Sequence, residues 1–362
     1  MRTSTCRFSR LLRRDAKPYT ANANKQRRKV KAGRQFKIAV SGKAGCGRYS
    51  DKLINERYEV TSSKQPRIAY EYAEEEIEHI VGRKGMNVAV DQTRLNGETF
   101  PRFVDAHVHL SDKEYAGCVD EIIQEARMAN VVALVSNSVD LETSIKSLEL
   151  AQKYAGLVYA ALGIQPGSVE HLAEQELDRT LNLISKQEMN KAMVAIGEIG
   201  LDSNHMSTWS DQLRVFDEML HCAERIRLPV IVHSRGAAEQ VIDRLPSYNL
   251  VKVLLHFFTG SADALSKAIE NGYYVSEGPA AAYSEGIREI VRKVPIANLL
   301  TETDGPVRFY KPPFKGKRTT PAFIPEVVRA IAKIKETGEQ SVAEKITGNF
   351  EQFFTLKLSM PR

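Results

Sequence analysis

Eight short apolar runs, separated by longer stretches of helical character, are the feature that most restricts how this 362-residue chain can fold. Continuous rather than alternating apolar character indicates strands that are buried on both faces. The runs occupy residues 103–110, 131–136, 157–164, 192–200, 229–234, 252–258, 273–278 and 298–304. The segments of helical periodicity between and after them include 112–129, 141–154, 210–227, 261–271 and 323–337.

Strict alternation of strand and helix favours right-handed parallel crossovers, as in α/β proteins. An open, doubly wound sheet shares this local pattern. Eight such units in about 240 residues match the size of a (β/α)8 TIM barrel. We therefore expect an α/β fold of the (β/α)8 barrel class over residues 101–362.

The formal charge of +6 is distributed unevenly along the chain. Residues 1–34 hold twelve Lys and Arg against one Asp, residues 35–85 are nearly balanced, and residues 86–362 carry −6. A basic, Ser-containing start is typical of an organellar transit peptide, of a phosphate-binding arm, or of a solvated tail without a role. We expect residues 1–34 to be a basic, disordered extension. The protein is expected to be cytoplasmic, or organellar if this segment is a transit peptide.

Residues 35–100 predict a small segment outside the barrel. Residues 36–49 have the pattern of a strand followed by a Gly-rich turn, and Gly42 and Gly47 have the spacing of a P-loop. Arg48 and Tyr49 stand where a P-loop needs Lys and Ser or Thr, so the turn is degenerate and a working nucleotide site is not expected. Residues 71–85 predict a short amphipathic helix.

Several classes of protein are excluded by what the chain lacks. No uncharged apolar run reaches the ~18–20 residues that a membrane-spanning helix needs. The cysteines are far apart and unpaired in spacing, which argues against a disulfide scaffold and against a thiolate zinc site. They are Cys6, Cys46, Cys118 and Cys222. We expect no membrane association and no required protein partner.

Polar residues of metal-ligand type collect at the carboxyl ends of the predicted strands, where the active site of a (β/α)8 barrel lies. Five of the predicted strands each contribute at least one such residue, and the first strand contributes two histidines. The residues are His107, His109, Glu198, His233, His256 and Asp304. His107 and His109 are two apart in a strand, so both point into the barrel.

Buried imidazoles and carboxylates that share a space are explained most simply by a bound cation. Six ligands exceed what one catalytic metal usually takes and suit two divalent cations. We expect His107, His109, Glu198 and Asp304 to hold one cation, and Glu198, His233 and His256 to hold the other. Glu198 would bridge, and Asp304 would accept a proton from the attacking water. Magnesium, manganese and zinc all suit such ligands.

The motifs resemble those of the TatD-type metal-dependent deoxyribonucleases, in the amidohydrolase-like barrel superfamily. The resemblance covers about residues 102–356 and rests on VDAHVHL, GEIGLD, PVIVHSR, HFFTG and LLTETDGP. It implies a (β/α)8 barrel, two metals and hydrolysis of phosphodiester bonds in DNA, with attack from the 3′ end as the common mode. It also implies metal roles for the six residues already selected by their position.

Two positions depart from the pattern of that family. Gln165 occupies the place of a histidine in the third strand motif, and an amide donates hydrogen bonds but moves no proton. Thr319 replaces an Asn that follows Arg318 in the family. We expect Gln165, Arg235, Lys317 and Arg318 to contact the substrate, since Lys and Arg suit phosphate oxygens.

Three functions fit these features. The first is a two-metal nuclease that acts on DNA, with RNA left open as a second substrate. The second is another hydrolase with the same site, such as an aminoacyl-tRNA deacylase or a small-molecule amidohydrolase, because a shared fold does not fix the substrate. The third is a nucleic-acid-binding protein that acts through its basic N-terminal arm.

Overall fold

The computed structural model describes the backbone of residues 34–42, 54–62, 89–90, 94–95, 98–99 and 101–358, and side chains from residue 101 onward. The chain divides into two compact units, Met1–Asp91 and Gln92–Arg362. In the first, β1 (Arg34–Gly42) pairs antiparallel with β2 (Ile54–Ser62) and β3 (Ala89–Val90). The basic extension before residue 34, the Gly-rich turn after β1 and the predicted helix at 71–85 lie outside the described residues.

The second unit is built on an eight-stranded parallel sheet, in the order β13-β12-β11-β10-β9-β8-β7-β6. Each strand coincides with one of the eight apolar runs, and β7 alone extends beyond its run, by one residue. The strands are β6 (Phe103–Val108), β7 (Val131–Asn137), β8 (Val158–Leu162), β9 (Met193–Gly200), β10 (Val230–His233), β11 (Val253–His256), β12 (Tyr274–Glu277) and β13 (Leu299–Thr301). A short hairpin, β4 (Arg94–Leu95) with β5 (Glu98–Thr99), precedes them.

The first and last strands meet, so the sheet is nearly closed. The Thr301 hydroxyl donates to the Val104 carbonyl at 2.6 Å. Beyond the strand ends, the Asp304 N–H donates to the His107 carbonyl at 2.9 Å, and the His109 N–H donates to the Gly305 carbonyl at 2.8 Å. Closure removes the open edges of the sheet, and the predicted (β/α)8 barrel is confirmed.

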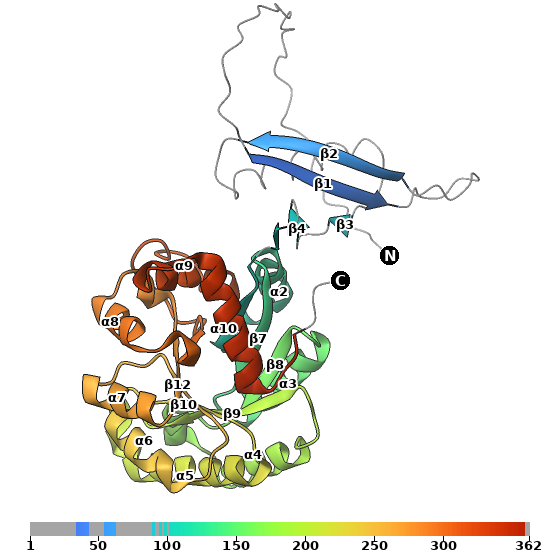
Figure 1. Cartoon of the computed structure of the whole chain (residues 1–362). Coiled ribbons are helices and arrows are strands. Elements are labelled where there is room, and N and C mark those ends of the chain that lie inside the picture. The colour runs from blue at the N-terminus through green and yellow to red at the C-terminus, as the bar shows by residue number, and fades with distance from the viewer. Residues whose placement is uncertain are drawn as a thin grey trace, which may run out of the picture. The chain divides into compact units, whose positions relative to one another are not determined.

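Helices surround the strands, as Figure 1 shows. Their apolar faces turn toward the sheet, and their polar faces turn outward. The helices are α2 (Val119–Met128), α3 (Leu141–Lys153), α4 (Glu176–Lys186), α5 (Trp209–Ile226), α6 (Ala238–Arg244), α7 (Ala262–Glu270), α8 (Glu285–Lys293), α9 (Ile324–Ile334) and α10 (Glu339–Phe354).

Two of the predicted boundaries that differ from the structure bear on the site. The helix expected over 112–129 begins only at Val119, because the Asp112 carboxylate caps a short 3-10 turn at Lys113–Tyr115 and Gly117 takes a left-handed φ of 81°. The last strand ends at Thr301 rather than at residue 304, so Asp304 lies in the following loop. Its φ of 51° is left-handed, a conformation that Asp tolerates better than most residues.

The core of the barrel is continuous and apolar, and all eight residues of β9 are buried. That burial on both faces is the physical reason for the uninterrupted apolar runs in the sequence. Among the described residues, no helix combines the length and the apolar character that a bilayer crossing requires.

Candidate metal centre

The six side chains selected from the sequence come together at the carboxyl end of the barrel. His107, Glu198, His233 and His256 lie within strands, whereas His109 and Asp304 come just after strand ends. All six are nearly inaccessible, and the His109 side chain is the most exposed of them at 12%. So much buried polarity in one place requires partners or a ligand.

The carboxylate of Glu198 lies at the middle of this group and faces a different set of residues with each oxygen. Its Oε1 lies 2.6 Å from His233 Nδ1 and 2.8 Å from His256 Nε2. Its Oε2 lies 3.4 Å from His109 Nε2 and 3.7 Å from His107 Nε2. Asp304 Oδ1 lies on the same side as Oε2, 3.4 Å from His109 Nε2 and 3.6 Å from His107 Nε2.

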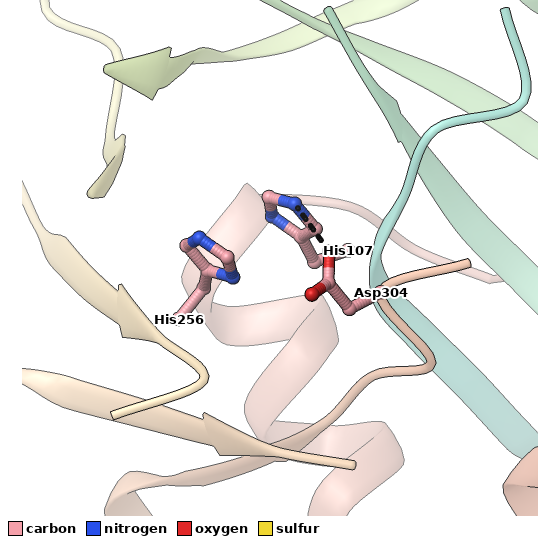
Figure 2. A group of neighbouring side chains, drawn as sticks. All are labelled: His107, His256 and Asp304. Carbon is pink, nitrogen blue, oxygen red and sulfur yellow. Dashed lines mark ion pairs between the residues drawn. The ribbon is translucent and has the colours of Figure 1, made fainter. Parts of the chain in front are cut away.

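We call His107, His109 and Asp304 around Oε2 the first half-site, and His233 and His256 around Oε1 the second half-site. Figure 2 shows His107 beside Asp304, with His256 opposite them. The rings of His107 and His256 stack with centroids 3.8 Å apart, so the half-sites are in direct contact.

The second nitrogen of three imidazoles faces an acceptor of the protein. His109 Nδ1 lies 3.0 Å from the Asn137 carbonyl, and His233 Nε2 lies 3.1 Å from Asp202 Oδ2. His256 Nδ1 lies 3.7 Å from Glu302 Oε1. The hydrogen-bond partners of His109 and His233 fix the ring orientation and the tautomer, and they turn the other nitrogen toward the centre as a lone pair. His256 Nδ1 lies too far from Glu302 for a hydrogen bond.

Ring nitrogens that point at one another provide a test of whether these residues suit a cation. His107 Nε2 lies 3.1 Å from His109 Nε2, and His233 Nδ1 lies 3.2 Å from His256 Nε2. The Nδ1 of His109 donates to a carbonyl, so in the neutral ring its Nε2 carries only a lone pair. Converging lone pairs and carboxylate oxygens repel one another without a positive charge between them. The donor set of imidazole and carboxylate therefore fits a divalent metal ion.

The protonation of the centre follows from the balance between burial and neighbouring charge. Burial raises the pKa of Glu198, but the imidazoles of His256 and His233 outweigh burial and hold it well below its usual range. Burial and the neighbouring imidazole of His256 hold the pKa of His107 well below the usual value, so this ring is neutral. Burial also lowers the pKa of His109, yet Asp304 and Glu198 outweigh it and raise the pKa to about 9.

The pKa values of both imidazoles in the second half-site are raised. Burial lowers the pKa of His233, but hydrogen bonds to Asp202 and Glu198 outweigh burial. Burial lowers the pKa of His256 as well, and the charges of Glu198 and Glu302 overcome this and raise it well above the usual value. The centre therefore already binds positive charge as protons, which a metal ion would displace.

Three overlapping sets of side chains have ligand atoms close enough together to hold a metal ion. They are His107, His109 and Glu198; Glu198, His233 and His256; and His107, His256 and Asp304, with the ligand atoms of each set within 4.8 Å of one another. The second set is the predicted grouping of Glu198 with His233 and His256, and the first contains three of the four residues of the other predicted grouping, without Asp304. The third crosses between the half-sites, so the distances alone do not fix the number of metal ions.

Three buried carboxyl groups lie next to this centre and were not assigned roles from the sequence. Asp105 accepts from the His107 N–H at 3.2 Å and from the Thr303 N–H at 3.1 Å, so it joins β6 to the loop that carries Asp304. Burial raises the pKa of Asp105 to about 8 and raises that of Glu277 well above its usual value. Glu302 accepts from the Ser276 hydroxyl and faces His256. In the sequence, the only sign of a role for these three residues is their position on the inner face of a strand or at a strand end.

The residues predicted to bind substrate are placed differently from one another. Gln165 reaches the centre, where its Nε2 donates to Glu198 Oε2 at 3.3 Å. Arg235 and Lys317 are exposed on loops that follow β10 and β13. Arg318 is half-buried, and its Nη1 donates to Cys118 Sγ at 2.9 Å. Among the described residues, none of the three cations contacts the six central side chains.

Comparison with known proteins agrees with this architecture. A family model described as TatD related DNase matches residues 104–355. The uncharacterized metal-dependent hydrolase YabD of Bacillus subtilis is 31% identical over 258 residues, which cover 70% of this chain and 98% of YabD. Human deoxyribonuclease TATDN3 is 30% identical over 262 residues, with coverage of 69% and 94%.

A solved structure extends the agreement to three dimensions. The crystal structure of YjjV, a TatD homolog from Escherichia coli K12, superposes with a TM-score of 0.66 at 27% identity. It covers 71% of this chain and 99% of YjjV. The resemblance seen in the sequence motifs is thereby confirmed, and the chain belongs to the TatD family of metal-dependent hydrolases.

Proposed function

We propose that this enzyme hydrolyses phosphodiester bonds of DNA with the help of two divalent cations. One observation carries the proposal: the two oxygens of Glu198 face two separate groups of imidazoles, at 2.6 and 2.8 Å on one side and at 3.4 and 3.7 Å on the other. A carboxylate shared between two groups of ligands is suited to a two-cation centre. Membership in a family with a member named deoxyribonuclease supports DNA as the substrate.

The residues that would hold the cations are those of the two half-sites. His107, His109 and Asp304 would hold one cation together with Glu198, and His233 and His256 would hold the other with the same carboxylate. When bound, the two cations supply Lewis acidity that activates water and offsets the charge of the scissile phosphate. Ligands of nitrogen and oxygen without thiolate suit magnesium, manganese or zinc.

Asp304 is the side chain that we assign as the general base. Its carboxylate is only 5% exposed and follows the last strand, where it faces the more accessible His109. A carboxylate in this position can accept a proton from an attacking water. Glu198 holds the two half-sites together, so that the attacking and leaving groups would be aligned on one phosphate.

Four further side chains would bind the substrate. The Gln165 amide donates to Glu198 and has a second N–H that can donate to a phosphate oxygen. Arg235, Lys317 and Arg318 are carried by loops on the catalytic face of the barrel, where their charges would attract phosphates. The role of these four side chains would be to orient the strand through hydrogen bonds and positive charge.

The test is the incubation of purified protein with magnesium or manganese and end-labelled single-stranded DNA. We expect progressive shortening of the strand, and labels at the 3′ and the 5′ end report the direction of attack. The Asp304→Asn variant is the control, and it keeps the size of the side chain while it removes the base. Degradation by the native protein that does not exceed degradation by this variant would contradict the proposal.

One observation favours esters and amides as a second class of substrate, to be tested in the same experiment. Gln165 places a neutral amide against the central carboxylate, where it can hydrogen-bond an ester or amide carbonyl as well as a phosphate. Parallel reactions with labelled RNA, with aminoacyl-tRNA and with small esters compare these substrates directly. Turnover of an ester that exceeds turnover of DNA would assign the enzyme to deacylation.

A further inference from the structure

The loop after β13 differs in charge from the rest of the barrel unit. Residues 307–318, with the sequence VRFYKPPFKGKR, contain five basic residues and no acidic residue, although residues 86–362 as a whole carry −6. The loop follows Asp304 almost immediately and belongs to the carboxyl-end face of the barrel, where the metal centre lies. Its charge is therefore concentrated beside the catalytic centre.

Two phenylalanines anchor this loop in the protein. Phe309 and Phe314 are 5% and 2% exposed, and the Phe314 ring lies 4.9 Å from that of Phe323 at the start of α9. The backbone of the loop is also tied, because the Lys315 N–H donates to the Lys311 carbonyl at 3.1 Å. Buried aromatic anchors and internal hydrogen bonds hold the exposed part of the loop in one conformation.

Tyr310 stands between these anchors and points into solvent. It is 78% exposed, and the neighbouring Val307 is 39% exposed. The aromatic pair that follows β11, Phe257 and Phe258, offers less surface, because Phe258 is fully buried and Phe257 is only partly exposed. An exposed aromatic ring on a fixed loop is suited to stack on a flat ligand.

The lysines around Tyr310 are available for an anionic ligand. Among the described side chains, Lys311, Lys315 and Lys317 form no ion pair with an acidic residue. Lys311 Nζ lies 5.6 Å from the centre of the Tyr283 ring, on the loop that follows β12. Three cations without acidic partners, on the same loop as an exposed ring, combine the two features that bind single-stranded nucleic acid, a basic surface and a stacking platform.

We propose that residues 307–318 form a binding surface for a single polynucleotide strand, on which Tyr310 stacks a nucleobase and Lys311 and Lys315 contact the flanking phosphates. The inference rests on the proposed nuclease function and extends it to residues away from the metal centre. A duplex would not use this surface in the same way, because its bases are already stacked on one another.

The distance between Tyr310 and the metal centre determines how long a DNA strand must be to contact both. Tyr310 lies six positions after Asp304, so the two backbones are at most ~22 Å apart at up to ~3.6 Å per residue. A stacked strand rises ~3.4 Å per nucleotide, so Tyr310 would lie within about seven nucleotides of the cleaved bond. We further place Tyr310 more than one nucleotide from the cleaved bond, so that a dinucleotide would be cleaved without its help.

The experiment compares Tyr310→Ala with the native enzyme on single-stranded DNA of two, four, eight and twelve nucleotides. We expect KM to rise about tenfold for the longest strands and to stay unchanged for the dinucleotide, with kcat unaffected, because stacking on one aromatic ring contributes ~1–3 kcal/mol. Tyr310→Phe should retain the native KM, since the ring is kept. Met189→Ala is the matched control, because Met189 is 92% exposed on the loop before β9, at the opposite end of the barrel.

A binding measurement separates this inference from the proposed function. In the Asp304→Asn background, fluorescence anisotropy of a labelled twelve-nucleotide strand should show weaker binding after Tyr310→Ala. The double change Lys311→Ala with Lys315→Ala should reduce the slope of log affinity against log salt by ~0.7 for each phosphate that a lysine no longer neutralises. The double change Lys186→Ala with Lys191→Ala, at the other end of the barrel, should not.

The outcomes are distinct. If the native protein cleaves DNA but Tyr310→Ala raises KM equally for all lengths or not at all, the surface is wrong and the nuclease function stands. Equal loss of affinity for single strands and for duplex would also overturn the inference. If the native protein cleaves no DNA, the nuclease function fails, and unchanged anisotropy for Tyr310→Ala would then reject the surface as well.

Discussion

The two halves of the candidate metal centre share one glutamate but are supported differently. In the second half-site, the outer nitrogens of His233 and His256 face the carboxylates of Asp202 and Glu302. In the first, His109 faces only the Asn137 carbonyl. Among the described residues, His107 Nδ1 and His256 Nδ1 are both buried without a hydrogen-bond partner, but only His256 Nδ1 has a carboxylate neighbour, Glu302 Oε1 at 3.7 Å. A carboxylate behind a ligating imidazole fixes the ring and makes the inner nitrogen a better donor.

This difference indicates that the two half-sites have different roles in metal binding and catalysis. The second half-site should bind its cation more tightly and serve a largely structural role in the centre. The first half-site contains Asp304 and the most exposed imidazole, His109, so it is the side that water and substrate reach. We expect the cation of the first half-site to exchange more readily. The four predictions that follow test this comparison.

The largest effect is expected for Glu198→Gln, which removes the charge that both half-sites share. Four imidazole nitrogens face the Glu198 carboxylate, and a neutral amide would turn an N–H donor toward some of them. We expect loss of metal from both half-sites and a fall in kcat of more than ~10³-fold, since loss of a bridging ligand disables the centre. Metal content by mass spectrometry of the isolated protein and the rate of DNA cleavage would measure this.

Glu277→Gln is a matched control for that change. Glu277 is also a fully buried glutamate, but burial and the charge of Glu302 raise its pKa well above the usual value, so it is uncharged at neutral pH. Replacement by an uncharged amide of the same shape should leave metal content nearly unchanged. If Glu198→Gln retained one full equivalent of metal, the half-sites would not depend on a shared carboxylate.

The next largest effect is expected for Asp202→Asn, which acts on the second half-site alone. Asp202 Oδ2 lies 3.1 Å from His233 Nε2, while Oδ1 accepts from the Asn204 N–H. An amide N–H in place of Oδ2 would force His233 to carry its proton on Nδ1, the nitrogen that faces Glu198. We expect ~10–100-fold weaker binding of one metal equivalent, which is typical when a ligating imidazole loses its carboxylate partner.

Calorimetric titration of the metal-free protein would measure the two equivalents separately. Asp211→Asn is the control, since its side chain is 62% exposed on α5 and lies away from the imidazoles. Equal weakening of both equivalents by Asp202→Asn would remove the distinction between the half-sites.

Asp202 also shows where reasoning from sequence alone reached its limit. The eight strands and the six central residues could be predicted, because buried parallel strands are apolar throughout and a barrel collects its functional groups at their carboxyl ends. Supporting residues such as Asp202 and Glu302 belong to the same motifs, but their contacts depend on how neighbouring strands are staggered. Sequence spacing does not define that stagger.

The direction in which a side chain points could not be predicted from the sequence either. Arg318 was selected as a phosphate contact by its loop, yet its guanidinium donates to the Cys118 thiol, which lies 200 residues away in the sequence. Tyr310 was not singled out at all, because only its exposure distinguishes it from the buried Phe309 beside it. Whether an aromatic residue of a loop is an anchor or a contact surface is decided by tertiary packing, which local sequence does not encode.

A change of one pH unit is expected to have a smaller effect on metal binding, of about tenfold at the first half-site. A metal ligand must be deprotonated, so a raised imidazole pKa weakens binding below that pKa, and affinity increases as the pH rises. In the first half-site, only His109 has a raised pKa, of about 9, while His107 is neutral. In the second, the pKa values of His233 and His256 are both raised by their carboxylate neighbours, against the effect of burial.

We therefore expect the affinity of the first half-site to rise about tenfold per pH unit between pH 6 and 9, and that of the second to rise more steeply. Calorimetry in two buffers of different ionisation enthalpy counts the protons released. Release of about one proton at the first half-site and of more at the second would agree with this. The same number at both would show that the carboxylates behind His233 and His256 do not raise their basicity.

The smallest effect is expected for Ser276→Ala, which reaches the second half-site through two contacts. The Ser276 hydroxyl donates to Glu302 Oε2, and Glu302 Oε1 faces His256 but has no hydrogen bond of its own. Without the serine, the buried carboxylate loses a donor, and its charged form is disfavoured. A protonated Glu302 would support His256 less, so metal binding at the second half-site should weaken only a few-fold. Removal of this hydrogen bond to a charged group should reduce stability by ~1.5–3 kcal/mol.

Thermal unfolding and metal titration of Ser276→Ala would separate these two effects, with Ser266→Ala as the control. Ser266 lies exposed on α7, and its hydroxyl donates only to the Ala262 carbonyl of its own helix. If the contacts of Glu302 matter only for stability, Ser276→Ala would lower the unfolding temperature and leave both metal affinities unchanged. A few-fold loss confined to the second metal equivalent would instead place Ser276 and Glu302 in the support of His256, and would account for the tighter binding expected there.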